Sequence, residues 1–232
     1  ALLEELMKVP GQTQELYDAQ RKARLDQLKA IVTDDPRNVD AHTKLVEFQW
    51  ILANVLGEKH PKLWSDFLVQ AGPLSRLVTD DVALYHNMAR AHAAQLASDP
   101  SQHAGVVTCY ALALKADPRD SRTYQLWASY LMNEARARTD GDTLAPAGIL
   151  SIEKVNERIA AAAEAYLADE DAPMQAQATL EKLSPRDVYR LGIDANPDSV
   201  SLRVGLAEYE YFSGNQDQAE DEFQRARAVE AK

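Results

Sequence analysis

The sequence is poor in the residues that mark specialised classes of protein. Its 232 residues include one cysteine, nine glycines and ten prolines, which argues against a disulfide framework and against a collagenous or low-complexity chain. Strand-forming residues are few beside alanine, leucine, glutamine and glutamate, and this composition favours helix. No apolar run reaches the roughly 18 residues that a membrane-spanning helix needs. We therefore expect a globular, helical chain with no transmembrane segment.

The amino-terminal segment lacks the features of a secretory signal, because no basic stretch precedes an apolar one. The chain begins at Ala1 and not at a methionine. We expect a cytoplasmic protein. The alternative is a soluble periplasmic or membrane-tethered domain from which a signal or anchor has been removed.

Positive charge is scarce. The chain carries 25 basic and 36 acidic side chains, a formal net charge of −11. A nucleic-acid-binding protein needs a basic surface to displace counterions, so this balance argues against that class, and we expect no nucleic-acid partner. The first 116 residues hold 12 basic and 14 acidic side chains, and the remainder holds 13 and 22. The excess of acid in the second half keeps the chain in solution or favours a cationic partner.

Catalytic and metal-binding signatures are missing. Cys109 follows an apolar stretch, and His103 lies six residues away, out of step with a helical turn. This pattern predicts a buried thiol and not a nucleophile. The five histidines include no pair spaced i, i+4, and the sequence contains no nucleophile elbow and no glycine-rich phosphate loop. We expect no enzyme activity, no metal and no cofactor.

Apolar residues recur at the spacing of an amphipathic helix along the whole chain. One such stripe begins at Tyr85 and another, with the same spacing, begins at Tyr124. No stretch alternates with a period of two residues. Because apolar residues at i, i+3, i+4 and i+7 lie on one face of a helix, the sequence predicts an all-α fold.

One junction between helices occurs three times. It consists of a helix end, an Asp or Asn, a proline and a capping residue, at 35–38, 117–120 and 196–199. The three prolines are 82 and 79 residues apart, which corresponds to two helical hairpins of about 40 residues between successive junctions. A junction without proline, Asp80-Asp81, and a looser one at 169–173 divide these intervals. We therefore predict an array of about five helical hairpins.

The last repeat, residues 199–232, resembles the tetratricopeptide repeat (TPR) family. Leu206 and Ala207 stand at the Leu-Gly pair of the first helix, and Gly214 stands at the turn. The second helix carries the small and aromatic residues that the motif asks for: Ala219, Phe223 and Ala226.

The resemblance is partial. The Trp and Tyr positions of the motif hold Arg203 and Glu210 in the last repeat, although Tyr85 takes the aromatic position in a second repeat over 82–118. The family resemblance implies a right-handed α-α superhelix over residues 38–232, preceded by an amino-terminal capping helix region over 1–37. We expect residues 149–167 to form the second helix of the unit that begins at Tyr124.

Proteins of this family act as scaffolds or adaptors that hold a peptide or helix of a partner in a concave groove lined by the first helices. The same non-catalytic function is expected here. Transferring the register of the motif gives the groove residues: Thr43, Glu47, Trp50, His86, Asn87, Arg90, Gln125, Ser129 and Asn133. We expect Trp50 to be partly exposed, and insertions at 98–104 and 139–148 to add specificity.

Other interpretations stay open. The polar groove residues could simply face water. The chaperone-binding members use a Lys and Asn clamp, and the Thr43, Glu47, His86 and Arg90 found here argue against that ligand. The alternative function is structural self-assembly into a homo-oligomer, in which the last repeat stacks on a second copy of the chain. The aromatic residues that would supply that contact are Tyr209, Tyr211 and Phe212.

Overall fold

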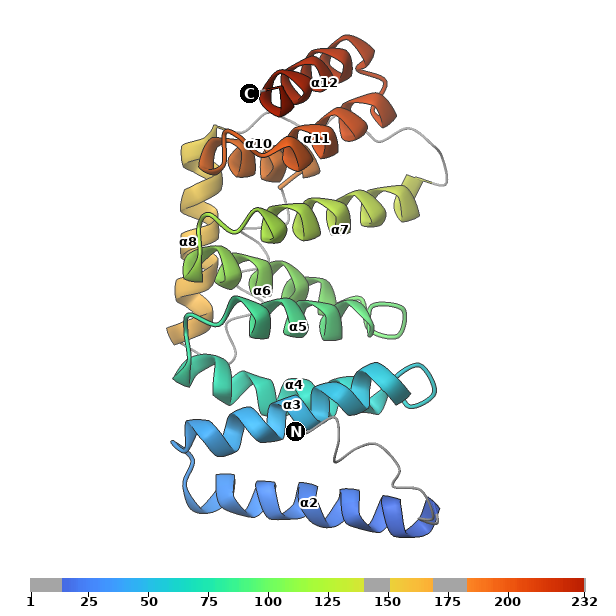
Figure 1. Ribbon diagram of the computed structural model, residues 1–232, viewed down its shortest axis with the longest axis vertical. Helices are drawn as coiled ribbons and strands as arrows, with labels where there is room; N and C mark the ends of the chain where they lie inside the picture. The colour runs from blue at the N-terminus through green and yellow to red at the C-terminus, as the bar shows by residue number, and fades with distance from the viewer. Residues whose placement is uncertain (1–13, 140–150, 169–182, 232) are drawn as a thin grey trace. The chain divides into compact units, whose positions relative to one another are not determined.

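The computed structural model describes residues 14–139, 151–168 and 183–231, and these residues form helices joined by turns with no strand among them (Figure 1). The predicted all-α class is confirmed. In chain order the helices are α2 (Gln14–Asp34), α3 (Val39–Leu56), α4 (Lys62–Leu77), α5 (Val82–Ala93), α6 (Gln102–Ala116), α7 (Ser121–Thr139), α8 (Ile152–Ala168), α10 (Pro185–Ala195), α11 (Val200–Phe212) and α12 (Gln216–Glu230).

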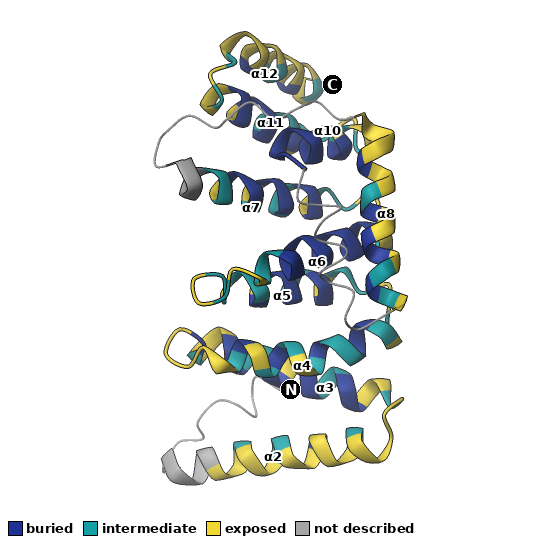
Figure 2. Ribbon diagram, turned by 180° about the vertical axis from the view of Figure 1, so that it is seen from behind, coloured by how far each residue is buried: buried dark blue, intermediate teal, exposed yellow. Residues whose placement is uncertain are grey.

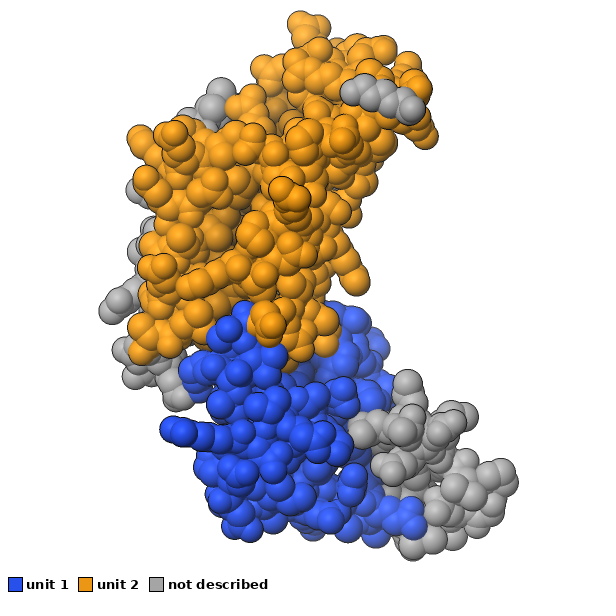
Figure 3. All heavy atoms as spheres, turned by 60° about the vertical axis from the view of Figure 1, so that its left-hand side comes forward, with its two compact units in different colours: residues 1–79, 90–100 blue, residues 80–89, 101–232 orange. Residues whose placement is uncertain are grey.

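The chain divides into two compact units, drawn in different colours in Figure 3. Unit 1 comprises residues 1–79 and 90–100, and unit 2 comprises residues 80–89 and 101–232. The division passes through α5. The predicted boundary between the capping region and the repeat array, after residue 37, falls in the turn between α2 and α3; as a domain boundary it stays a prediction.

In unit 1, α3 and α4 form a hairpin, and α2 packs on α3. The hairpin core consists of apolar side chains from both helices, with Leu45 and Phe67 fully buried. Most described side chains of α2 are exposed, and Leu28 is its one buried side chain among residues 19–34 (Figure 2). A helix with a single narrow apolar contact and a polar outer face is suited to closing a stack of repeats against water.

In unit 2, the residues that follow α7 pair differently from the prediction. The predicted helix at 149–167 is present as α8, but α7 packs mainly against α10, and α8 packs against α6 and α10. Figures 1 and 2 show α8 running across the other helices of the unit. The assignment of this helix as the hairpin partner of α7 is therefore wrong.

The close approach of α10 to α7 has a local cause in Gly192. A Cβ atom at this position would lie only 2.8 Å from Cγ of Tyr124 on α7. A side chain here would force the two helices apart, because real Cβ contacts are not that short. The next pair uses the same device, since a Cβ atom on Gly205 of α11 would lie 2.5 Å from the ring of Tyr189 on α10.

The three predicted junctions have one geometry. At each, the backbone N–H of the capping residue donates to the carbonyl oxygen of the Asp or Asn three positions earlier, at 3.0–3.2 Å. The side chain six positions after the proline then donates to the proline carbonyl oxygen. These side chains are His42 (3.0 Å), Tyr124 (2.7 Å) and Arg203 (2.9 Å). The junction that recurs in the sequence therefore recurs as a set of hydrogen bonds, in which three different residue types supply the side-chain donor.

Side chains cap several of the described helix starts, whereas α4, α6 and α12 begin without a side-chain cap. Asn38, Asp81, Asp120 and Ser199 each accept a hydrogen bond from the backbone N–H three residues later, at 2.9–3.4 Å. Ser184 and Asp187 form a reciprocal capping box ahead of α10. Each cap satisfies a backbone donor that the helix leaves unpaired. After α11, Gly214 adopts φ +82°, a left-handed turn that glycine tolerates.

The two departures from the TPR motif in the last repeat form ion pairs. Nη1 of Arg203 lies 3.5 Å from Oε2 of Glu222 on α12. Glu210 is 2% exposed, pairs with the buried Arg186 of α10, and accepts a hydrogen bond from Asn215 at 2.9 Å. Charged pairs therefore join neighbouring helices at positions where the motif uses aromatic packing.

Candidate partner-binding surface

In unit 1, Thr43, Glu47 and Trp50 follow one face of α3, and they are half-buried, exposed and half-buried. The ring of Trp50 lies 5.9 Å from Trp64 and 5.2 Å from Phe67, measured between centroids. Trp64 is 8% exposed and Trp127 is fully buried. The prediction that Trp50 is partly exposed is confirmed, and the other two tryptophans belong to the core.

Arg90 completes this part of unit 1. Its guanidinium carbon lies 5.5 Å from the centroid of the Trp50 ring. Such a cation–π contact orients the guanidinium while leaving its N–H groups available. Arg90 is exposed, and no carboxylate of the described residues forms an ion pair with it. The sequence placed Trp50 and Arg90 on the same surface, and the structure brings them into contact.

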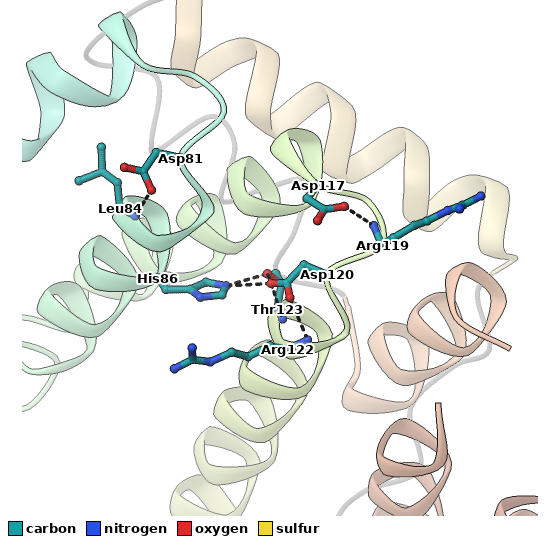
Figure 4. A network of polar contacts seen from close by, with 8 residues as sticks. All are labelled: Asp81, Leu84, His86, Asp117, Arg119, Asp120, Arg122 and Thr123. Carbon is teal, nitrogen blue, oxygen red and sulfur yellow. Dashed lines mark hydrogen bonds and ion pairs between the residues drawn. The ribbon is translucent and has the colours of Figure 1, made fainter. Parts of the chain in front are cut away.

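In unit 2, His86 belongs to a polar network at the start of α7 (Figure 4). Its Nε2 lies 2.6 Å from Oγ1 of Thr123, and that hydroxyl donates to the Asp120 carboxylate at 2.5 Å. Because the Thr123 proton is committed to Asp120, Nε2 of His86 donates to the hydroxyl oxygen, and the same nitrogen lies 3.6 Å from the Asp120 carboxylate. The structure therefore gives His86 a part in joining α5 to α7. Asn87, beside it, is half-buried.

The pKa of His86 is lowered from its ordinary value, chiefly because burial disfavours the charged ring; Asp120 acts in the opposite direction, and Arg122 adds to the lowering. The unfolded chain thus takes up a proton at higher pH than the folded chain. The stability that neutral His86 contributes is complete above the unfolded pKa of about 6.5 and is lost as pH falls through the lower folded pKa.

We therefore expect the unfolding midpoint in urea to fall between about pH 7 and pH 5, and the variant His86→Asn to show a shallower fall. Circular dichroism at a series of pH values measures both curves. The exposed His60 supplies the control, since His60→Asn is expected to keep the wild-type slope. Parallel curves for wild type and His86→Asn would contradict the assignment.

Gln125 and Ser129 of α7 line a groove of about 680 Å³ that α7 shares with α10 and α11. The Gln125 amide donates to the hydroxyl of Ser201, and the Tyr189 hydroxyl donates to Sδ of Met132 at 3.9 Å. The remaining lining residues come mostly from α11: Ser199, Val200, Ser201, Val204, Gly205 and Glu208. Asn133, the last predicted position, is exposed farther along α7.

The register of the repeat could have identified two of the residues that sequence reasoning missed. Gln125 and Ser129 stand seven and eleven positions after Pro118, and the same offsets from Pro197 give Val204 and Glu208. Both of these line the groove. No comparable sequence pattern identifies Tyr189 as a lining residue, because α8 separates α7 from α10 in the chain.

The burial of Cys109 and of the carboxy-terminal aromatic residues tests two further expectations. Cys109 is 1% exposed, and burial raises the pKa of its thiol, as expected of a core residue. Tyr209 is 1% exposed, so its assignment as a self-assembly contact is wrong; Tyr211 and Phe212 are 58% and 38% exposed. The acidic junction at 169–173 and all but the first residue of the predicted insertion at 139–148 lie outside the described residues.

Over the described ranges, no group of three or more His, Cys, Asp or Glu side chains is arranged to hold a metal ion. None of the helices described is both long enough and apolar enough to traverse a lipid bilayer.

No family model and no curated protein matches the chain. Among solved structures it is similar to a crystal structure of MamA, with 13% identity, 97% of each chain covered and a TM-score of 0.46. A second crystal structure of MamA protein is 14% identical in sequence, with 94% of this chain and 87% of that chain covered and a TM-score of 0.47. The MamA RS-1 ArsTM double mutant is 13% identical in sequence, with 91% of this chain and 85% of that chain covered and a TM-score of 0.44.

Proposed function

We propose that this protein is a non-catalytic interaction scaffold that holds a segment of a partner protein against its first helices. The observation that carries the proposal is the groove of unit 2. Residues at equivalent repeat positions on α7 and α11 line it together: Gln125, Ser129, Val204 and Glu208. Successive first helices presenting equivalent positions to one open surface is the way in which helical repeats bind extended partners.

The chemistry of the groove suits binding. Its lining offers amide and hydroxyl groups beside the apolar Val200 and Val204, and Glu208 is its one carboxylate among the described lining residues. Amides and hydroxyls can pair with the backbone of an extended segment, while apolar side chains give contact area. A catalytic site would bring titratable groups together, as general acid–base chemistry requires.

Photocrosslinking tests the proposal. A photoreactive amino acid at Ser129 is expected to capture a partner from the native source, whereas the same residue at Gln224, exposed on α12, is the control. Ser129→Arg should abolish capture by a probe at the neighbouring Gln125, because a long charged side chain would fill the groove.

Each outcome of that experiment decides something. Equal capture from Ser129 and Gln224, or undiminished capture from Gln125 in the Ser129→Arg variant, would contradict the proposed groove. A crosslinked product with the mass of two chains would identify a second copy as the occupant. That result would favour self-assembly, which the exposed aromatic pair Tyr211–Phe212 also supports, with ring centroids 5.7 Å apart.

A further inference from the structure

Unit 1 carries a cationic and aromatic surface, whereas the described lining of the unit 2 groove has one carboxylate and no basic side chain. Trp50 is half-buried, supported from below by Trp64 and Phe67, and covered in part by the Arg90 guanidinium at 5.5 Å. We call these two residues the Trp50–Arg90 pair. We propose that the pair binds an acidic side chain, flanked by an apolar residue, within an internal segment of a partner protein. This inference rests on the proposed function and specifies the chemistry of the partner.

The charge of Arg90 is the first support. The chain has 36 acidic side chains for 25 basic ones, yet Arg90 forms no ion pair with a described carboxylate. The buried Arg186 and the half-exposed Arg225, by contrast, both have carboxylate partners. A guanidinium held on an aromatic face presents its N–H fork in a fixed plane, which matches the two oxygens of a carboxylate. The unsatisfied charge therefore selects an acid.

Trp50 is the second support. Trp50 is the one tryptophan that is not buried, because Trp64 is 8% exposed and Trp127 is fully buried. The contacts with Trp64 and Phe67 hold the ring in place, so little conformational entropy is lost when a ligand covers it. A partly exposed indole held in place beside a cation favours an apolar residue next to the acid.

The rest of the α3 face indicates that the acid belongs to a continuing chain. Thr43 and Glu47 extend the same face of the helix beyond Trp50, and neither is buried. A partner segment can therefore run past the pair along α3. Glu47 has no ion pair among the described residues, so a second acid placed toward it would be repelled. The arrangement favours a partner segment with one acidic side chain in contact with Arg90, and it disfavours a second acidic side chain near Glu47.

Tryptophan fluorescence of the full chain provides the first test. Because Trp50 is the most exposed of the three tryptophans, external quenchers report mainly on it. Arg90 attracts anions, so quenching by iodide should decrease by about two-fold in Arg90→Gln, while quenching by the neutral molecule acrylamide should not decrease. Equal iodide quenching in wild type and Arg90→Gln would show that Arg90 creates no anion-binding surface at Trp50, and would overturn the proposal.

Blocked peptides provide the second test. The probe is an acetylated and amidated peptide, Gly-Ser-Asp-Leu-Ser-Gly, compared with its Asn-Leu counterpart and with a peptide that ends in a free Asp-Leu carboxyl terminus. We expect saturable binding of the Asp peptide and at least about 10-fold weaker binding of the Asn peptide, since a charge-assisted bidentate contact distinguishes them by that factor. Anisotropy of dye-labelled peptides measures both, independently of Trp50.

Variants separate recognition from folding. Arg90→Gln should weaken the Asp peptide about 10-fold or more with an unchanged circular dichroism spectrum, and Arg90→Lys should give an intermediate loss because an ammonium lacks the planar fork. Ser65→Ala, an exposed position on α4, is the control. Absence of saturable Asp binding, or equal binding of Asp and Asn peptides, would overturn the proposal. Binding only of the free-terminus peptide would assign the surface to a chain end and overturn the internal segment.

The two proposals can fail separately. If photocrosslinking at Ser129 captures a partner while the Asp peptide does not bind, the scaffold function is supported and the proposed acidic ligand is contradicted. If the Asp peptide binds and Ser129 captures nothing, the Trp50–Arg90 pair is a ligand site and the unit 2 groove is not.

Discussion

Replacing Glu210 with alanine is expected to lower the free energy of unfolding by about 3–5 kcal/mol. Glu210 and Arg186 are 2% and 6% exposed, and Asn215 also donates to the Glu210 carboxylate. Removal of the carboxylate would leave a buried guanidinium without its counter-charge, and this penalty exceeds the net benefit of the pair itself. Urea unfolding followed by circular dichroism measures the change.

Two further variants test the cause of that loss. The double variant Arg186→Met, Glu210→Leu should recover most of the stability, because it removes both charges and fills similar volume with apolar atoms. Asp221→Ala, which breaks the exposed pair with Arg225 at 2.6 Å, should cost less than about 1 kcal/mol. A double variant as unstable as Glu210→Ala would mean that packing, and not an uncompensated charge, explains the loss.

Replacing Trp127 with alanine is expected to cost about 3–5 kcal/mol. Trp127 is fully buried and stacks on Tyr110, with centroids 6.2 Å apart and planes 18° apart. Tyr110 also contacts Tyr130, so a cavity at Trp127 would remove support from several rings that join α6 to α7. Thermal or urea unfolding of the full chain measures the loss.

Phenylalanine at this position is expected to cost clearly less than alanine. It keeps most of the apolar volume, and it removes Nε1, which has no hydrogen-bond partner in the described structure. The half-buried Trp50 supplies a comparison within the same chain: Trp50→Ala should cost about 1–2 kcal/mol, because less of its surface leaves water on folding. Equal losses at the two tryptophans would contradict the difference in burial.

Local signals in the sequence predicted the helices and the junctions well. A cap, a proline and an apolar stripe act within a few residues, so their effect is readable without knowledge of the fold. The junction at 117–120 illustrates this, since its cap, its turn and the position of its proline were all evident. The hydrogen bond from the residue six positions later was not, because histidine, tyrosine and arginine share no sequence pattern although each can donate a hydrogen bond there.

The candidate site was predicted to a similar degree. The helical register identified Gln125 and Ser129, which do line a groove, and it put Trp50 and Arg90 on one surface. It also included His86, whose ring is engaged with Thr123 at 2.6 Å. The register gives the face of a helix on which a residue lies; whether a neighbouring helix covers that residue depends on contacts between segments distant in sequence.

By itself the sequence determined the all-α class, the position of the three proline junctions and the solvated character of the first described helix, because these follow from local propensity and capping. Only the tertiary structure decided which helices pair. The α7–α10 contact depends on the missing side chain of Gly192 against Tyr124, and the burial of Glu210 depends on an arginine 24 residues away. Such choices compare the packing of whole helices, and no local pattern contains that comparison.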